Sequence, residues 1–198
     1  MTKIKICGLT RMADIAAVNA AKPDYIGFVF TESRRRVVPE QAAALRAVLS
    51  PGIVPVGVFV NQPAAEILRL LRAGIISIAQ LHGQESDADI RQIQRAGFPV
   101  IRAFRVQNAA DAARALQSPA DILLLDSGSG GTGQVFDWSL VPKIDRPWFL
   151  AGGLSPENVA QAAKTLHPWG MDVSSGAETD GKKDLAKIEA IIRRIRNV

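Results

Sequence analysis

Short apolar runs recur at regular intervals along the chain, and each is followed by a stretch with helical spacing. The runs are rich in Val and Ile, are bounded by Gly, Pro, Asn or Asp, and repeat roughly every 24 residues. Strands that alternate with helices form parallel sheets, because each return to a parallel strand needs a crossover. Eight such units account for nearly all of the chain, so the sequence predicts an α/β fold whose parallel sheet closes into a barrel. The strands are predicted to begin near Ile4, Tyr25, Val54, Ile78, Val100, Ile122, Trp148 and Met171.

The connecting helices have recognisable signals. Pro39, Pro63 and Pro156 are each expected to open a helix at its first turn, where a missing N–H is tolerated. In the last helix, apolar residues fall at positions i, i+3, i+4 and i+7 and form one stripe. These residues are Ile188, Ile191, Ile192 and Ile195. No linker or low-complexity segment divides the sequence, which predicts a single small domain over residues 1–198.

Composition excludes several classes of protein. The chain has 198 residues, and its 24 Lys and Arg against 19 Asp and Glu give a formal charge of +5. One Cys cannot close an intramolecular disulfide, and with two scattered His it cannot build a Cys-rich zinc site. No apolar run approaches the ~20 residues that span a bilayer, and the first residues lack the apolar region of a secretion signal. We expect a soluble, cytoplasmic protein without a metal, with a preference for anionic ligands and none for nucleic acid or membranes.

Two predicted strand ends have the composition of a phosphate-binding site. Gly152 and Gly153 follow the seventh strand, and Ser174, Ser175 and Gly176 follow the eighth. Small residues let backbone N–H groups approach an anion closely, and barrels of this kind commonly hold phosphate after these two strands. Gly152 and Gly153 could instead serve only as a tight turn, but the two loops together favour phosphate.

A glycine-rich segment at residues 128–133 matches the dinucleotide-binding pattern G-x-G-x-x-G. No long amphipathic helix follows it, and Gly153 stands about 20 residues further on, where the ribose-binding acid belongs. We therefore reject nucleotide binding and interpret the segment as a lid that closes over a site beside Asp126.

Reactive side chains are predicted at the same rim of the barrel. Cys7 ends the first strand and Asp126 the sixth, and the carboxyl ends of barrel strands are where catalytic residues gather. Taken alone, Cys7 could be a small buried apolar residue and Asp126 a turn former. His82 could contact substrate or be a hydrogen-bonded core residue, and both readings stay open. His167 is expected to have a structural role.

Five blocks of sequence closely resemble the phosphoribosylanthranilate isomerases of tryptophan biosynthesis. They are Lys-Ile-Cys-Gly-Leu-Thr at residues 5–10, Gln-Leu-His-Gly at 80–83, Leu-Asp-Ser at 125–127 with Gly-Gly-Thr-Gly at 130–133 and Phe-Asp-Trp at 136–138, Leu-Ala-Gly-Gly-Leu at 150–154, and Asp-Val-Ser-Ser-Gly at 172–176. Gly-Lys-Lys-Asp at 181–184 adds to the match. The resemblance implies a small (β/α)8 TIM barrel without metal or organic cofactor. It also implies conversion of N-(5-phosphoribosyl)anthranilate into the 1-deoxyribulose phosphate by an Amadori rearrangement.

The resemblance further implies residue roles. Asp126 is the general acid that opens the furanose ring, Cys7 is the general base that removes the C2 proton, and Arg35 recognises the anthranilate carboxylate. The run of three Arg at 34–36 leaves Arg36 as an alternative to Arg35. His82 and the two small-residue loops are assigned to binding of the phosphorylated substrate, by a monomer or a homodimer.

The chain departs from the family pattern at two positions. Val38 stands where a hydroxyl residue usually precedes the helix-opening Pro, and Ala177 stands where Val is usual. Loss of the hydroxyl cap costs the helix about 1 kcal/mol and affects no catalytic role.

Two other functions fit parts of this reading. A related isomerase of histidine biosynthesis would share the barrel and the chemistry, but it resembles a duplicated half-barrel with Asp as the base and phosphate sites on both halves. A non-catalytic barrel could bind a phosphorylated metabolite. Cys7 and the single phosphate cradle are evidence against the histidine-pathway enzyme, and turnover by a Cys7→Ala variant would separate catalysis from binding alone.

Overall fold

Eight parallel strands form a closed barrel in a computed structural model of the chain, which describes residues 1–126 and 138–198. Each strand pairs with the next in the sequence, and the eighth pairs with the first. The predicted strand starts are confirmed, with differences of one residue at the first and last strands. The strands are β1 (Lys3–Cys7), β2 (Tyr25–Val29), β3 (Val54–Phe59), β4 (Ile78–Leu81), β5 (Val100–Arg105), β6 (Ile122–Asp126), β7 (Trp148–Leu150) and β8 (Gly170–Val173).

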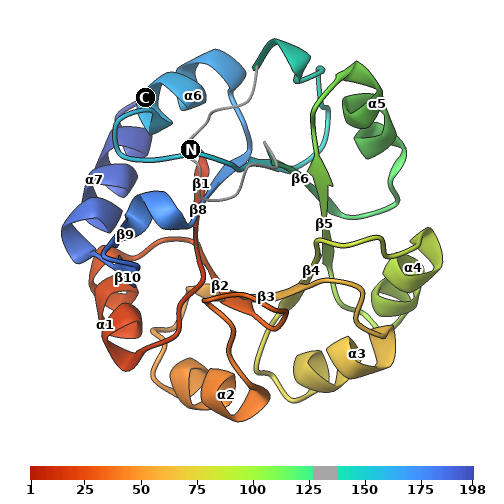
Figure 1. The fold of residues 1–198 in the computed structure, drawn as a ribbon, viewed down its shortest axis with the longest axis horizontal. Coiled ribbons are helices and arrows are strands. Elements are labelled where there is room, and N and C mark those ends of the chain that lie inside the picture. Colours follow the sequence, from red (N-terminus) through yellow and green to blue (C-terminus); the bar gives the residue numbers. More distant parts are fainter. Residues whose placement is uncertain (127–137) are drawn as a thin grey trace.

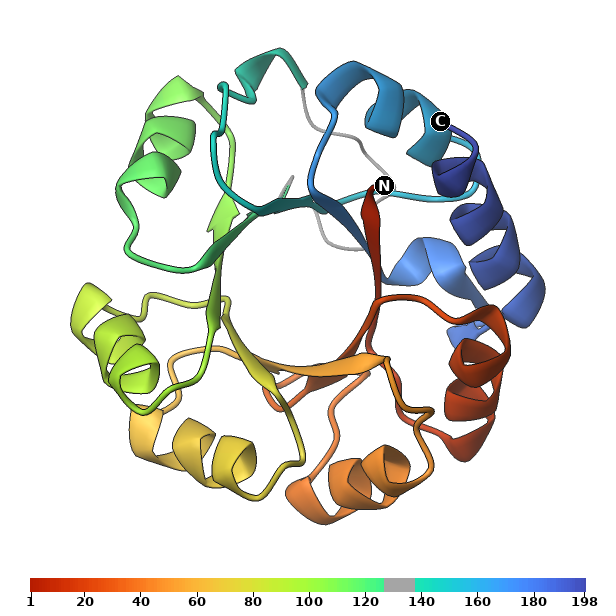
Figure 2. The ribbon, with the colours of Figure 1, turned by 180° about the vertical axis from the view of Figure 1, so that it is seen from behind.

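Helices form an outer ring around the barrel (Figure 1), and the view from behind in Figure 2 shows the same ring. The last helix packs against the first and so closes the ring. Its predicted isoleucine stripe is confirmed, because all four side chains are buried. The helices are α1 (Met12–Ala21), α2 (Pro39–Ala47), α3 (Ala64–Arg72), α4 (Asp87–Arg95), α5 (Ala109–Gln117), α6 (Val159–Leu166) and α7 (Leu185–Arg196).

The helix starts differ in part from the prediction. Pro39 is the first residue of α2 as expected, whereas Pro63 directly precedes α3. The prediction for Pro156 was wrong, because α6 begins three residues later at Val159. The intervening turn is held by Asn158, whose side chain donates to the Gly153 carbonyl and accepts from the Ser155 N–H.

The connection from β6 to β7 departs from the repeat in its described part. Residues 138–147 contain one turn of 3-10 helix, η1 (Trp138–Leu140), and no α-helix. The predicted lid at residues 128–133 lies outside the described residues.

The barrel separates two large apolar cores, and a third small cluster of Cys7, Val29 and Val58 lies at the pocket. The larger lies between the strands and the helices, and the smaller fills the inside of the barrel. Phe149 is fully buried in the inner core and meets Tyr25 and Trp169 edge to face, with ring centroids 5.6 and 5.2 Å away. A side chain at Gly170 would collide with Phe149, since a Cβ there would lie 2.4 Å from its ring. The inner core therefore blocks the barrel, and a ligand can enter only at a rim.

After β8 the chain forms a short 3-10 turn, η2 (Ser175–Ala177), and a small antiparallel pair, β9 (Glu178–Thr179) and β10 (Lys182–Lys183). This insertion brings Glu178 and Lys183 back to the carboxyl ends of the strands. None of the described helices is long and apolar enough to cross a membrane.

Candidate active site

A pocket of about 500 Å³ opens at the carboxyl ends of the barrel strands. It collects residues from strands that are far apart in the sequence, as expected for a barrel of this type. Eight of the nine site residues expected from the sequence line it. They are Cys7, Arg35, His82, Asp126, Gly152, Gly153, Ser174 and Ser175.

Cys7 is the last residue of β1 and is 8% exposed. Its sulfur lies over Gly27 of β2, where an added Cβ would come within 2.6 Å of Sγ. Gly27 therefore provides the space in which the thiol sits. Burial raises the pKa of Cys7 above its usual range, although Lys5 and Lys183 act in the opposite direction. Burial thus favours the neutral thiol, and the two ammonium groups favour the thiolate that a general base requires.

Asp126 is the last residue of β6 and lies next to His82 in the pocket. His82 Nε2 is 3.5 Å from Asp126 Oδ2. The other ring nitrogen of His82, Nδ1, lies 3.2 Å from the side-chain Nε2 of Gln80. If the Gln80 amide donates to Nδ1, the proton of the neutral imidazole is on Nε2 and is directed at Asp126. The His82 side chain is 34% exposed, so it stands at the pocket wall and not in the core.

The two small-residue loops lie side by side at one end of the pocket. Gly152 and Gly153 have φ values of 88° and 63°, which other residues rarely adopt. Gly176 does not line the pocket but permits the loops to touch, since a Cβ there would lie 2.0 Å from the Leu154 carbonyl oxygen. Ser174 Oγ donates to the Cys7 carbonyl at 3.1 Å and so ties this end of the pocket to β1.

Arg35 and Arg36 have different surroundings. The stem of Arg35 crosses Gly8, where an added Cβ would lie 2.3 Å from its Cδ, and the side chain enters the pocket. Arg36 pairs with the exposed Glu32 and lines a separate pocket of about 380 Å³ beside α2 and α3. Only Arg35 of these two lies in the pocket with Cys7.

The carboxylate of Glu178 fixes Arg35, a contact that the sequence did not predict. Oε1 accepts from Arg35 Nε at 2.6 Å and from Lys183 Nζ at 2.7 Å, and Oε2 accepts from Arg35 Nη2 at 2.9 Å and from Arg34 at 2.7 Å. Burial alone would raise the pKa of Glu178, but these hydrogen bonds and charges bring it below its usual range. Glu178 is therefore ionised and pairs with three cations, of which Arg34 and Arg35 line the pocket and Lys183 is buried beside it.

Three polar residues of the barrel strands were not predicted from the sequence to belong to the site. Gln80 and Asp172 line the pocket, and Lys5 lies below it, fully buried. A signal for them was present, because each interrupts a run that otherwise reads as a buried strand. Residues of that kind are rarely buried without a pairing partner, but the sequence alone does not identify that partner.

A second pocket of about 730 Å³ shares His82 and Asp126 with the first. Arg102, Arg105 and Arg114 make it strongly cationic. Arg102 pairs with Glu85 at 2.5 Å and stacks over Phe104. Asp126 thus stands between two compartments that could each attract an anion.

Comparison with known proteins finds one family over nearly the whole chain. The model of the N-(5'phosphoribosyl)anthranilate (PRA) isomerase family matches residues 4–194. The chain is 48% identical to N-(5'-phosphoribosyl)anthranilate isomerase of Lacticaseibacillus casei (strain BL23), over 99% of this chain and 96% of the relative.

Solved structures give the same family. Phosphoribosyl anthranilate isomerase from Thermotoga maritima has a TM-score of 0.92 at 38% identity, with both chains fully covered. A phosphoribosyl anthranilate isomerase in complex with reduced 1-(o-carboxyphenylamino)-1-deoxyribulose 5-phosphate has a TM-score of 0.87 at 35% identity, again over both full chains.

Proposed function

The chain belongs to the N-(5'-phosphoribosyl)anthranilate isomerase family, and from that premise we propose that Cys7 and Asp126 are the base and the acid of its reaction. The enzyme is an isomerase of tryptophan biosynthesis. It converts N-(5-phosphoribosyl)anthranilate into 1-(2-carboxyphenylamino)-1-deoxyribulose 5-phosphate by an acid/base Amadori rearrangement. The family excludes the histidine-pathway isomerase and the non-catalytic barrel as alternatives.

The observation that carries the residue assignment is the shared pocket. Cys7 and Asp126 come from β1 and β6, yet both line one space with the small-residue loops after β7 and β8. A sugar phosphate whose phosphate group is held by those loops has its ring within the same pocket. The acid and the base can then act on one molecule from two sides.

Asp126 acts first in this scheme. Its protonated carboxyl donates to the ring oxygen of the furanose, the C1–O bond breaks, and the anthranilate nitrogen forms a protonated Schiff base with C1. Asp126 is left as a carboxylate. His82 Nε2, at 3.5 Å, is placed to stabilise that charge.

Cys7 acts second. As a thiolate it removes the proton from C2, so that an S–H bond forms and the C–H electron pair moves into a C1–C2 double bond. The Schiff-base nitrogen receives the displaced electron pair. The resulting enolamine then tautomerises to the ketone, and no oxidant or reductant is consumed.

We assign Arg35 to the anthranilate carboxylate. Its guanidinium is planar, and Glu178 accepts hydrogen bonds from Nε and from one N–H of Nη2. Nη1 and the second N–H of Nη2 can then donate to the substrate carboxylate. Arg35→Ala is expected to raise KM well above wild type, with a smaller effect for Arg36→Ala. The opposite ranking would assign the carboxylate to Arg36.

The same proposal covers the remaining binding residues. Gly152, Gly153, Ser174 and Ser175 hold the phosphate through backbone N–H groups, and Gly176 allows their two loops to touch. All of these residues belong to one chain, so a monomer of one barrel domain over residues 1–198 is sufficient for activity, and a homodimer would contain two separate sites. We expect the enzyme to work in the cytoplasm without nucleic acid.

The test compares catalysis with binding in the same variants. Cys7→Ala is expected to lower kcat by roughly 10² to 10⁴, because a positioned base is lost, while the reduced product analogue still binds in a calorimetric titration. Asp126→Asn is expected to block ring opening. Ring opening is measured by the change in anthranilate fluorescence of the substrate. Full turnover by either variant at saturating substrate would remove that residue from the mechanism, and the histidine-pathway substrate serves as the specificity control.

A further inference from the structure

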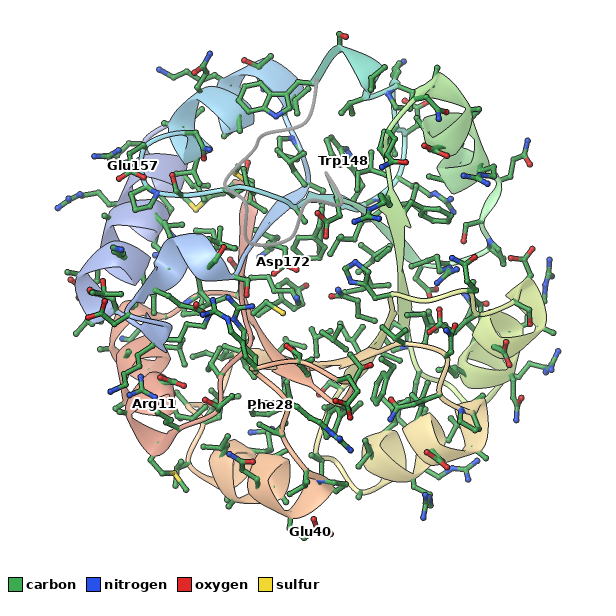
Figure 3. All side chains as sticks on the ribbon, in the orientation of Figure 1. Arg11, Phe28, Glu40, Trp148, Glu157 and Asp172 are labelled. Carbon is green, nitrogen blue, oxygen red and sulfur yellow. The ribbon has the colours of Figure 1, made fainter. Side chains whose placement is uncertain are left out.

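An ion pair lies inside the barrel at the floor of the pocket, where Asp172 lines the pocket and Lys5 lies beneath it. Lys5 of β1 has no exposed side-chain surface, and its Nζ donates to Asp172 Oδ2 of β8 at 2.8 Å. The two strands are neighbours and pair Lys5 with Asp172 in register. Figure 3 shows Asp172 inside the ring of strands. Two charged groups thus occupy a position that apolar side chains usually fill in barrels.

The pair is incompletely satisfied within the described part of the chain. Asp172 Oδ1 is buried and has no hydrogen-bond partner among the described residues. A buried ion pair is costly to desolvate, and an apolar pair of similar volume is often no less stable. Stability alone therefore gives a weak reason for charges at this position.

The strand geometry directs Lys5 at the thiol. Side chains two residues apart on a strand point to the same face, so Lys5 and Cys7 both point into the barrel, with Lys5 one layer deeper. The Lys5 ammonium is close enough to Cys7 for its positive charge to lower the pKa of the thiol. The sulfur lies against Gly27 of β2, in the space that a side chain at that position would fill.

We propose that Lys5 is a positioning residue for the isomerisation, whose buried ammonium group is the counter-ion of the Cys7 thiolate and is held in place by Asp172. This inference rests on the proposed role of Cys7 as the base. Lys5 itself does not touch the reacting carbon. It stabilises the thiolate before the C2 proton is removed, and the proton then resides on Cys7.

The ionisation of the groups supports this arrangement. Burial would lower the pKa of Lys5, but Asp172 and Cys7 raise it above its usual range, so Lys5 remains an ammonium. Burial raises the pKa of Cys7, Lys5 lowers it more than Asp172 raises it, and Lys183 of β10 lowers it further. The other charged or titratable groups that line the pocket with Cys7 are Arg34, Arg35, His82 and Asp126.

The experiment measures the titration of Cys7 directly. Cys7 is the only cysteine in the chain, so the rate of alkylation by iodoacetamide as a function of pH reports its thiolate alone. In Lys5→Met the midpoint is expected to rise by about one pH unit or more, and the alkylation rate at pH 7.5 to fall by about tenfold or more. In the pH profile of kcat/KM, the midpoint that reports the ionisation of Cys7 is expected to rise by the same number of pH units.

Lys3→Met is the matched control. Lys3 lies on the same face of β1 two residues before Lys5, but it is 44% exposed and pairs with Asp24. Its removal is expected to leave the Cys7 midpoint unchanged. An unchanged midpoint in Lys5→Met as well would overturn the proposal.

A double variant covers the case in which the unpaired Asp172 prevents folding. Lys5→Met/Asp172→Asn removes both charges and keeps the shapes. Its midpoint is expected above that of the wild type, because Lys5 lowers the pKa of Cys7 more than Asp172 raises it, and a midpoint at or below the wild-type value refutes the proposal. Because alkylation needs no turnover, these results stand apart from the role of Cys7 as base, which Cys7→Ala tests.

Discussion

Replacing Glu178 with Gln is expected to destabilise the fold and weaken substrate binding together. The Glu178 side chain is 4% exposed and Lys183 1%, whereas Arg35 is 19% and Arg34 59% exposed. Breaking a buried ion pair by removal of one partner costs about 3–5 kcal/mol. The pair with the exposed Arg34 contributes under about 1 kcal/mol of the expected loss in unfolding free energy. A protein of this size loses roughly 2–4 °C in Tm per kcal/mol, so Tm is expected to fall by about 10 °C.

Circular dichroism melts and steady-state kinetics test this expectation. KM is expected to rise with little change in kcat, because Arg35 loses the carboxylate that orients it before substrate arrives. The matched control is Glu32→Gln, which breaks the 2.7 Å pair with Arg36 at a carboxylate that is 92% exposed. That change is expected to move Tm by only a degree or two. Equal Tm shifts in the two variants would refute the reasoning.

The pH dependence gives a second check on Glu178. Its pKa is lowered in the folded protein from an ordinary value of 4.5. The stabilisation it provides is therefore fully present above the unfolded-state pKa, and it is lost as the pH falls through the folded-state pKa. The difference in unfolding free energy between wild type and Glu178→Gln is expected to be largest above about pH 5.5 and to shrink in acid. A difference that stays constant from pH 7 to pH 3 would contradict the assignment of an ionised Glu178.

Three further substitutions test the packing. Gly27→Ala places a Cβ 2.6 Å from Cys7 Sγ and is expected to lower kcat by roughly 10-fold or more through displacement of the thiol; an unchanged kcat would contradict it. Gly170→Ala places a Cβ 2.4 Å from the Phe149 ring, so a loss of about 1–3 kcal/mol is expected in urea unfolding, and wild-type stability would show that the inner core has room. Val38→Ser supplies the missing cap of α2 at an exposed position and is expected to raise stability by about 1 kcal/mol in the same assay, whereas a loss would show that Val38 stabilises the helix by packing.

The strands of the barrel could be predicted because their signal is local. Each apolar run is covered on both faces, so β3 and β6 read as continuous hydrophobic segments between turn residues. The helix ends were harder to place. The turn before α6 is closed by hydrogen bonds of the Asn158 side chain, and Pro156 alone does not reveal them.

The charged network around the pocket could not be predicted for a different reason. Lys5 of β1 contacts Asp172 of β8, and Arg35, which follows β2, contacts Glu178, which follows β8. Nothing in the local pattern of either segment identifies its partner. The choice between Arg35 and Arg36 was open for the same reason, since it depends on how the loop after β2 crosses Gly8.

The most direct test of the account is a crystal structure of this chain with the reduced product analogue bound. We expect the phosphate on the loops at Gly152–Gly153 and Ser174–Gly176, with Cys7 Sγ and the Asp126 carboxylate on either side of the C1–C2 bond. The aromatic carboxylate is expected against Arg35. A phosphate bound instead in the cationic pocket of Arg102 and Arg105, with Cys7 remote from C2, would contradict the assignment of the base and the acid.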